Sequence, residues 1–202
     1  YNENLVRELL VNSIAHKSNT ISNDITIRVY PDHICISNPG GLPLGVTKDN
    51  ILHTKHRRNP NMIEILSAPG LMEGEGSGYD LIYELNAAES KIQPEIESTF
   101  NTVTVYQSAK ITDKEVVRLM DYVDHNYQLS QKNKIAFGII AREKRISSTD
   151  LSKILQLTGE ERLRSYTDNL DKMHLIARGG VKKGTYFQIN ETILRNAKSN
   201  IE

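Results

Sequence analysis

The chain has 202 residues, of which 38% are hydrophobic and 25% are charged, and its formal net charge at pH 7 is zero. This length and composition are typical of an ordinary globular protein with one large domain or two small ones, and they exclude a disordered chain. A net charge of zero favours no class of partner, although residues 113–202 carry about four more basic than acidic side chains.

The cysteine count and the hydropathy of the chain bear on its location. Cys35 is the only cysteine, so no disulfide can form within the chain, and we expect a reducing, cytoplasmic environment. No apolar run reaches the length of a membrane span or of a signal peptide, so we expect no membrane partner. Because the sequence begins at Tyr1 rather than at a methionine, we expect a fragment that lacks an upstream domain.

Helical and strand patterns alternate over residues 1–110, which we expect to form the first of two domains. Apolar side chains recur at helical spacing near the start, and two alternating runs around Pro31-Asp32 predict a hairpin. In chain order, the predicted elements are a helix over residues 3–17, strands over Ile25–Tyr30 and His33–Ser37, short helices capped by Thr47 and over Pro60–Ser67, a helix from about Gly78 to Ala88, and strands over Ile92–Ile96 and Thr102–Tyr106.

Residues 111–202 are richer in helical patterns and form the second predicted domain. The predicted elements are helices over Asp113–Asn126, Gln131–Arg142, Thr149–Leu155 (capped by Ser148) and Gly159–Met173 (capped by Thr158), then strands over Leu175–Arg178 and Thr185–Ile189. Helices followed by a helix–turn–helix and a hairpin are typical of a winged helix-turn-helix domain.

The first candidate site is a carboxylate and an amide in the N-terminal helix. Glu8 and Asn12 are four residues apart, so their side chains share one face of that helix. An amide oxygen is a suitable ligand for Mg²⁺, and a nearby carboxylate could orient a water molecule. The alternative is a solvated helix surface, on which Glu and Asn at this spacing are common.

Two glycine-rich segments supply further candidates. Asn38-Pro39-Gly40-Gly41 follows the predicted hairpin, and it is either an exit loop or a place where the backbone approaches a ligand. Gly74, Gly76, Ser77 and Gly78 precede a helix, whose free N–H groups and dipole would favour a phosphate; the alternative is a turn. The chain contains no Gly-Lys-Ser or Gly-Lys-Thr, and no βαβ unit surrounds the glycines, so neither a Walker loop nor a Rossmann fingerprint is present.

Taken in order, these motifs resemble the GHKL (Bergerat) ATP-binding fold of gyrases, Hsp90-type chaperones and histidine kinases. The segments RELLVNSIAHKS, ISNPGGLP, RRNPNMIEIL and GLMEGEGSGYDLI are similar to the C-terminal region of bacterial transcriptional regulators that are often labelled RecG-related ATP-dependent DNA helicases. In that family a Schlafen-type AlbA-like domain usually precedes this region and a winged helix usually follows it. The resemblance implies an α+β chain, in which a degenerate GHKL-like two-layer α/β sandwich (1–110) is followed by a winged helix-turn-helix domain (111–202).

The resemblance also implies roles for individual residues. Glu8 matches the water-activating position and Asn12 the magnesium position, while Gly41 and Pro43 match the end of the first glycine box. The implied cofactor is ATP or ADP with Mg²⁺, and the implied binding residues are Asn12, Ser37, Asn38, Gly40, Gly41, Gly74, Gly76, Ser77 and Gly78.

The first glycine box departs from the family pattern. GHKL ATPases bind the adenine amino group with an aspartate in this box, and here that position falls on Ser37, with Asn38 next to it. The first glycine of the box falls on Pro39. A serine hydroxyl can accept or donate a hydrogen bond but carries no charge, so the sequence favours nucleotide binding over steady hydrolysis.

Residues 159–173 are the candidate recognition helix of the second domain. Arginine, lysine and asparagine are typical of contacts to phosphates and base edges. The candidate residues for binding double-stranded DNA are Arg162, Arg164, Ser165 and Asn169 in this helix, Lys182 and Lys183 in the predicted wing, and Lys153 in the preceding helix. Glu160 and Glu161 would repel phosphate, and winged helices also serve as protein–protein or dimer modules, so both alternatives stay open.

The sequence therefore favours a transcriptional regulator in which the state of the first domain sets the disposition of a DNA-binding second domain. An active ATPase that uses Glu8 and Asn12 is one alternative, and a non-catalytic scaffold that assembles homodimers is another. A helicase motor is not expected, because the phosphate-loop lysine and acidic magnesium ligands of such motors are missing.

Overall fold

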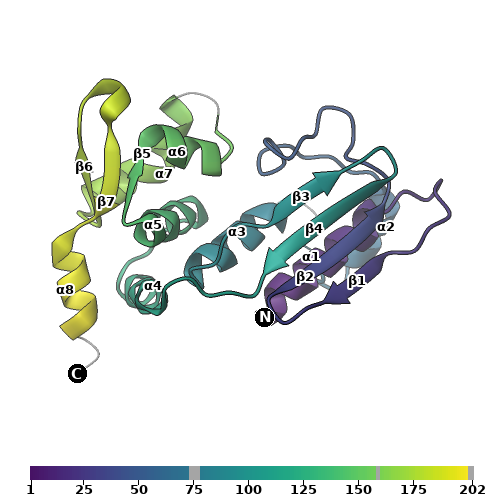
Figure 1. Ribbon diagram of the computed structural model, residues 1–202, viewed down its shortest axis with the longest axis horizontal. Helices are drawn as coiled ribbons and strands as arrows, with labels where there is room; N and C mark the ends of the chain where they lie inside the picture. Colours follow the sequence, from purple (N-terminus) through teal and green to yellow (C-terminus); the bar gives the residue numbers. More distant parts are fainter. Residues whose placement is uncertain (73–77, 158–159, 200–202) are drawn as a thin grey trace. The chain divides into compact units, whose positions relative to one another are not determined.

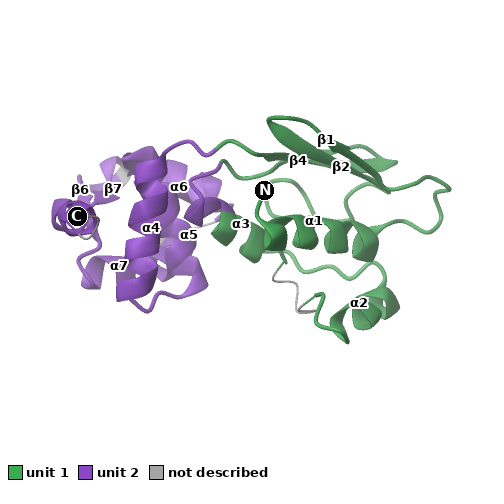
Figure 2. Cartoon of the chain, turned by 90° about the horizontal axis from the view of Figure 1, so that it is seen from below, with its two compact units in different colours: residues 1–85, 92–110 green, residues 86–91, 111–202 purple. Residues whose placement is uncertain are grey.

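The chain folds into two compact units (Figures 1 and 2). A computed structural model describes residues 1–72, 78–157 and 160–199, which contain eight α-helices and two antiparallel sheets, so the fold class is α+β. Unit 1 comprises residues 1–85 and 92–110, and unit 2 comprises residues 86–91 and 111–202. Within the described ranges, no helix combines the length and the apolar character needed to cross a membrane.

Unit 1 is built on a four-stranded antiparallel sheet with the strand order β1-β2-β4-β3. The strands are β1 (Thr26–Val29), β2 (His33–Pro39), β3 (Glu95–Ser98) and β4 (Thr102–Ser108). The predicted hairpin is present, but β3 begins at Glu95 rather than Ile92. Pro94, which has no N–H group to donate to a ladder, directly precedes the strand.

Helices cover one face of this sheet, as Figure 2 shows for α1 (Glu3–His16). Alternate residues of β2 point toward the helices, since successive side chains of a strand face opposite ways. The resulting core joins Leu5 and Leu9 of α1, Ile34 and Ile36 of β2, and Ile82 of α3 (Gly78–Ala88). The periodicity of the N-terminal segment thus predicted the correct helix, and Leu5 and Leu9 lie on its buried face.

Residues 48–53 form consecutive turns, so the short helix predicted after Thr47 is wrong. The Thr47 N–H donates to Asn50 Oδ1 at 2.7 Å, and Thr47 Oγ1 accepts from the Asp49 N–H at 3.3 Å. Side chains that bond to nearby backbone groups compete with helical hydrogen bonds. The next predicted helix is present as α2 (Pro60–Ser67), which has proline in its first turn.

Unit 2 contains five helices and a three-stranded antiparallel sheet of order β5-β7-β6 among its described residues. Its elements are α4 (Lys114–Asn126), α5 (Gln131–Glu143), β5 (Arg145–Ser147), α6 (Ser148–Ile154), α7 (Glu160–Lys172), β6 (Ile176–Gly179), the 3-10 turn η1 (Lys182–Gly184), β7 (Tyr186–Ile189) and α8 (Glu191–Ser199). The sequence did not predict β5 or α8. The N-cap of α6 is Ser147, whose Oγ accepts from the Asp150 N–H at 3.0 Å, and not the predicted Ser148.

Helix α5 is the centre of unit 2. Ile135, Phe137, Ile139 and Ile140 are all fully buried, so the helix contacts neighbours on several sides. Gly138 lies so close to the end of α3 that a Cβ there would be 2.7 Å from Ala87 Cβ and 2.8 Å from the Ala87 carbonyl oxygen. A side chain at this position would have to displace backbone atoms.

We therefore expect Gly138→Val to lower the free energy of unfolding by about 3 kcal/mol, because an overpacked core costs about that much. Urea unfolding followed by circular dichroism would measure the change. Gly184→Val is the matched control, since a Cβ at Gly184 meets nothing within 4 Å. Equal effects of the two substitutions would show that the contact with Ala87 is not tight.

Candidate functional site

Glu8 and Asn12 form one hydrogen-bonded pair on α1. The helix begins at the Asn2 cap, whose Oδ1 accepts from the Asn4 and Leu5 N–H groups. Asn12 Nδ2 donates to Glu8 Oε1 at 2.8 Å, and Glu8 is only 7% exposed. A carboxylate is costly to bury without partners. The pair is therefore not a solvated helix surface.

Gly78, the first residue of α3, lies directly against this pair. A Cβ on Gly78 would collide with Glu8 Oε1 and would lie 2.8 Å from Asn12 Nδ2. The structure thus brings the Glu8–Asn12 motif together with Gly78, the last residue of the second glycine-rich segment. Gly74, Gly76 and Ser77, which belong to the same prediction, lie outside the described residues.

The Asn38-Pro39-Gly40-Gly41 segment is held in place by Arg58. Its guanidinium donates to the His16 carbonyl at 3.0 Å and to the Gly41 carbonyl at 2.5 Å. Gly40 adopts φ +95°, a left-handed conformation that favours glycine, and a Cβ there would be 2.6 Å from Ser18 Cβ. Gly41 approaches the β3–β4 turn through a hydrogen bond from its N–H to the Phe100 carbonyl. This loop therefore has one defined shape.

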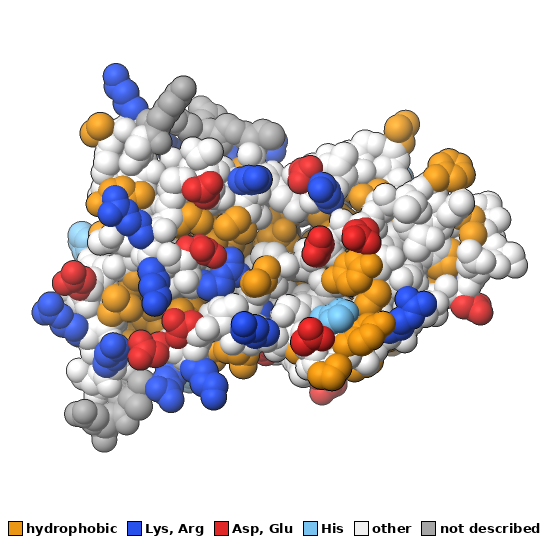
Figure 3. Space-filling view, in the orientation of Figure 1, with side chains coloured by type: hydrophobic (Ala, Val, Ile, Leu, Met, Phe, Trp, Pro, Cys, Tyr) orange, Lys and Arg blue, Asp and Glu red, His pale blue; other side chains and the backbone are white. Residues whose placement is uncertain are grey.

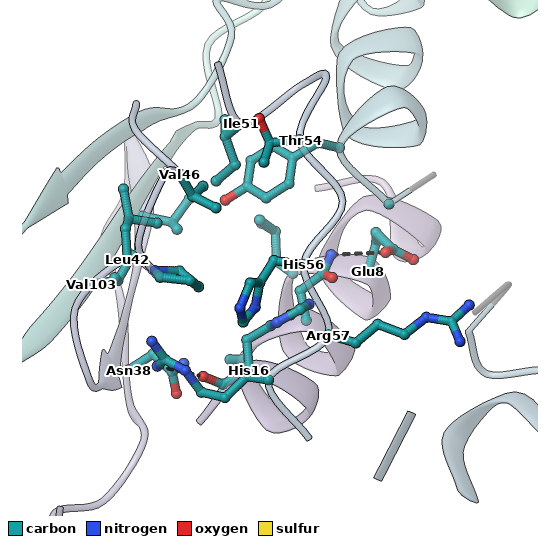
Figure 4. A pocket seen from close by; sticks show the side chains of 18 of the residues that line it. Glu8, His16, Asn38, Leu42, Val46, Ile51, Thr54, His56, Arg57 and Val103 are labelled. Atoms are coloured by element: carbon teal, nitrogen blue, oxygen red, sulfur yellow. Dashed lines mark hydrogen bonds between the residues drawn. The ribbon is translucent and has the colours of Figure 1, made fainter. Parts of the chain in front are cut away.

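A cavity of about 190 Å³ lies among these elements in unit 1 (Figure 4). Figure 4 shows Leu42, Val46, Ile51 and Val103 on one side of the cavity and Glu8 on the other. The lining also includes Asn12, His16, Asn38, Gly40, Gly41, Gly78, Lys55, His56, Arg57 and Arg58. The cavity thus pairs an apolar wall with the Glu8–Asn12 pair and several cationic side chains, a combination suited to a flat ring that carries an anionic group.

Ser37 and Asn38 point to opposite faces of the sheet. Ser37 Oγ is hydrogen-bonded to Thr104 Oγ1 at 3.0 Å, and Ser37 does not line the cavity. Asn38 does line it, is 8% exposed, and its Oδ1 has no hydrogen-bond partner among the described residues. The cavity-facing place that the motif comparison gave to Ser37 therefore belongs to Asn38. Counting in steps of two from the apolar pair Ile34 and Ile36 would have found it.

His16 lies at the polar end of the cavity, close to Arg58 and His56. Burial, the Arg58 guanidinium and His56 together hold the pKa of His16 below its ordinary value of 6.5. The imidazole is therefore neutral at pH 7. A bound anion would oppose these effects, because it stabilises the protonated ring.

Only two of the described residues predicted to contact DNA line the same groove in unit 2. Arg164 of α7 and Lys182 of η1 line a groove together with Arg178 of β6, which the sequence analysis missed. Arg178 pairs with the buried Phe187 in the β6–β7 hairpin, so both side chains lie on the same face of the sheet. No sequence motif or residue spacing identifies Arg178 as a candidate for DNA binding. Ser148, Thr167 and Asp168 also line the groove.

The other candidates do not gather in this groove. Ser165 Oγ donates to the Arg162 carbonyl at 2.6 Å, and Lys153 is exposed on α6. Asn169 Nδ2 donates to Asn133 Oδ1 at 3.2 Å, so its amide already joins α7 to α5. The Lys183 side chain lies outside what the structure describes. Figure 3 shows basic and acidic side chains interspersed on the face of unit 2 that it draws, so this face has no uniformly basic surface.

Comparison with known proteins supports the first unit most directly. The family model described as "Putative ATP-dependent DNA helicase recG C-terminal" matches residues 22–106, which is less than half of the chain. This match confirms the expected similarity of the region to a RecG-related, ATPase-like domain. No curated protein matches the sequence.

The chain is similar to a solved structure over almost its whole length. The DIP2311 protein from Corynebacterium diphtheriae superposes with a TM-score of 0.77 at 22% sequence identity. The match covers 97% of this chain but only 42% of the other. At this identity the likeness shows a shared fold and nothing about activity.

The lowered pKa of His16 predicts that stability falls in mild acid. The unfolded chain takes up a proton at the ordinary histidine pKa of about 6.5, whereas the folded chain does so only at lower pH. Unfolding therefore becomes easier as the pH falls below about 6.5, and the effect levels off below the pKa of the folded state. Urea midpoints of wild type and His16→Gln at pH 7.5 and pH 5.5 would measure it.

We expect His16→Gln to lose less stability than wild type between these pH values. His125→Gln is the control, because His125 is exposed on α4. An identical pH dependence in wild type and His16→Gln would contradict the assignment.

Proposed function

We propose that unit 1 binds a purine nucleotide together with Mg²⁺. The observation that carries this proposal is the buried Asn38 amide, whose Oδ1 has no partner among the described residues and which lines a cavity with apolar walls. A buried polar atom without a partner is costly, and a ligand that donates a hydrogen bond would remove that cost. The match to an ATPase-like family over residues 22–106 supports the same proposal.

The residues present fit such a ligand at both ends. At the base end, Ile36 and Val103 flank Asn38 with apolar surface. At the phosphate end, Gly78 lets the start of α3 lie directly against Glu8 and Asn12, where a Cβ would collide with Glu8 Oε1. Since Asn12 Nδ2 donates to Glu8, the Oδ1 of Asn12 is the amide atom that would hold the metal.

Magnesium bound there would neutralise phosphate charge. Glu8 keeps the Asn12 amide oriented through their hydrogen bond and would orient a water molecule if hydrolysis occurs. Lys55 and Arg57, both exposed at the rim, add positive charge that favours an anion.

Calorimetric titration of ADP and ATP with Mg²⁺ into the protein tests this proposal. We expect Asn12→Ala to weaken magnesium-dependent binding by at least about tenfold, because it removes a metal ligand and the partner of Glu8. Asn23→Ala, an exposed substitution away from the cavity, is the matched control. Phosphate release measured on the same samples would show whether Glu8 supports turnover. Absence of heat with every nucleotide would overturn the proposal.

A second function is favoured by the groove of unit 2. We propose that unit 2 is a winged helix that binds double-stranded DNA, and that the chain regulates transcription in response to the ligand state of unit 1. Arg164, Arg178 and Lys182 come from three different elements and line one groove. None of the three has an ion-pair partner in the described part of the chain, so their charges are available to phosphates.

Removing one of these charges should weaken DNA binding in a salt-dependent way. We expect Arg178→Ala to lower affinity for all sequences alike and to reduce the slope of log affinity against log salt by about one, as for a lost phosphate contact. Fluorescence anisotropy with a labelled duplex at several salt concentrations would measure both. Arg195→Ala, which removes the same charge from α8, is the control. If both variants bind alike, the groove is not the contact surface.

A further inference from the structure

Asn38 differs from Asn12 and Asn59 of the same unit in having no fixed side-chain orientation. Asn12 is oriented by its bond to Glu8, and Asn59 by two bonds from its Nδ2 to the Ala15 and Lys17 carbonyls. Asn38 has no side-chain hydrogen bond to any described residue, although it is 8% exposed. Nothing among these residues therefore decides which of its two amide atoms faces which way.

An amide without a fixed orientation can recognise two opposite patterns of hydrogen-bonding groups. Its oxygen accepts and its nitrogen donates, and the two atoms have nearly the same size. Adenine presents an amino donor beside a ring acceptor, whereas a 6-oxopurine such as guanine or hypoxanthine presents a carbonyl acceptor beside a ring N–H donor. Turning the amide of Asn38 by half a rotation about its last bond matches either edge. A carboxylate has only acceptors and cannot do this.

We propose that Asn38 reads the edge of the base and that the cavity consequently accepts 6-oxopurine nucleotides as well as adenine nucleotides. This inference rests on the proposed binding of nucleotides in unit 1. Asn38 is only 8% exposed and lies beside Ile36 and Val103 in the cavity wall, and a hydrogen bond is stronger where burial lowers the local dielectric. The site would then bind purines whose donor and acceptor are exchanged, as between adenine and hypoxanthine, but would not bind a base that lacks both groups.

Inosine diphosphate is the sharpest probe, because it has the shape of ADP with the donor and acceptor exchanged. We expect the dissociation constants of magnesium-ADP and magnesium-IDP for the wild-type protein to agree within about tenfold in calorimetric titrations. We expect Asn38→Leu to weaken both by about tenfold or more, since the polar edge of either base would lose its partner. Asn38→Asp should weaken IDP by about tenfold relative to ADP, since the carboxylate opposes the carbonyl of hypoxanthine.

The wild-type comparison needs no variant, so the test does not depend on how well a substituted protein folds. If ADP binds and IDP binds at least about a hundredfold more weakly, the inference is overturned while nucleotide binding stands. An unchanged ADP-to-IDP ratio in Asn38→Asp also overturns it. Failure of both nucleotides to bind the wild-type protein overturns the proposed function and the inference together.

Discussion

The close approach of α3 to the Glu8–Asn12 pair is the constraint on which unit 1 depends. Because Gly78 leaves no gap for a side chain, the first turn of α3 is fixed against α1. One turn later, Ile82 reaches the core formed with Leu5 and Ile36. The same contact therefore sets the polar end of the cavity and the packing of both helices on the sheet. A change that loosened it would affect stability and site together.

The opposite end of α1 is fixed by polar contacts instead. The last carbonyls of a helix lack partners within the helix. Here the Arg58 guanidinium donates to the His16 carbonyl, while Asn59 Nδ2 donates to the carbonyls of Ala15 and Lys17. Arg58 also bonds to Gly41, so the helix end and the glycine loop share one cation. The lowered pKa of His16 follows directly, because that cation lies beside a partly buried imidazole.

Helices and strands with strong periodicity were predictable from the sequence. The direction in which a strand side chain points and the contacts between elements distant in the sequence were not. The glycine at 78 was found because its motif opens a helix. Of the two neighbours that the motif comparison named, Asn38 lines the cavity and Ser37 does not, because a motif comparison ignores which way a strand residue points. The helix predicted after Thr47 was wrong because a threonine side chain that accepts from a nearby N–H can stabilise a turn as well as cap a helix. Arg178 was not predicted as a binding residue, because only the fold shows that it lines a groove with residues of α7 and η1.

Helix α3 does not belong to one unit alone: residues 78–85 count with the first and 86–91, from its last turn onward, with the second. Asn86 and Lys91 are almost fully buried, and the Arg142 guanidinium donates to the Lys91 carbonyl at 2.6 Å. A fragment ended after residue 110 would carry this segment without the residues that bury it. The two units therefore cannot be separated by a single cut in the chain. A chimera that replaces unit 2 would also have to replace residues 86–91.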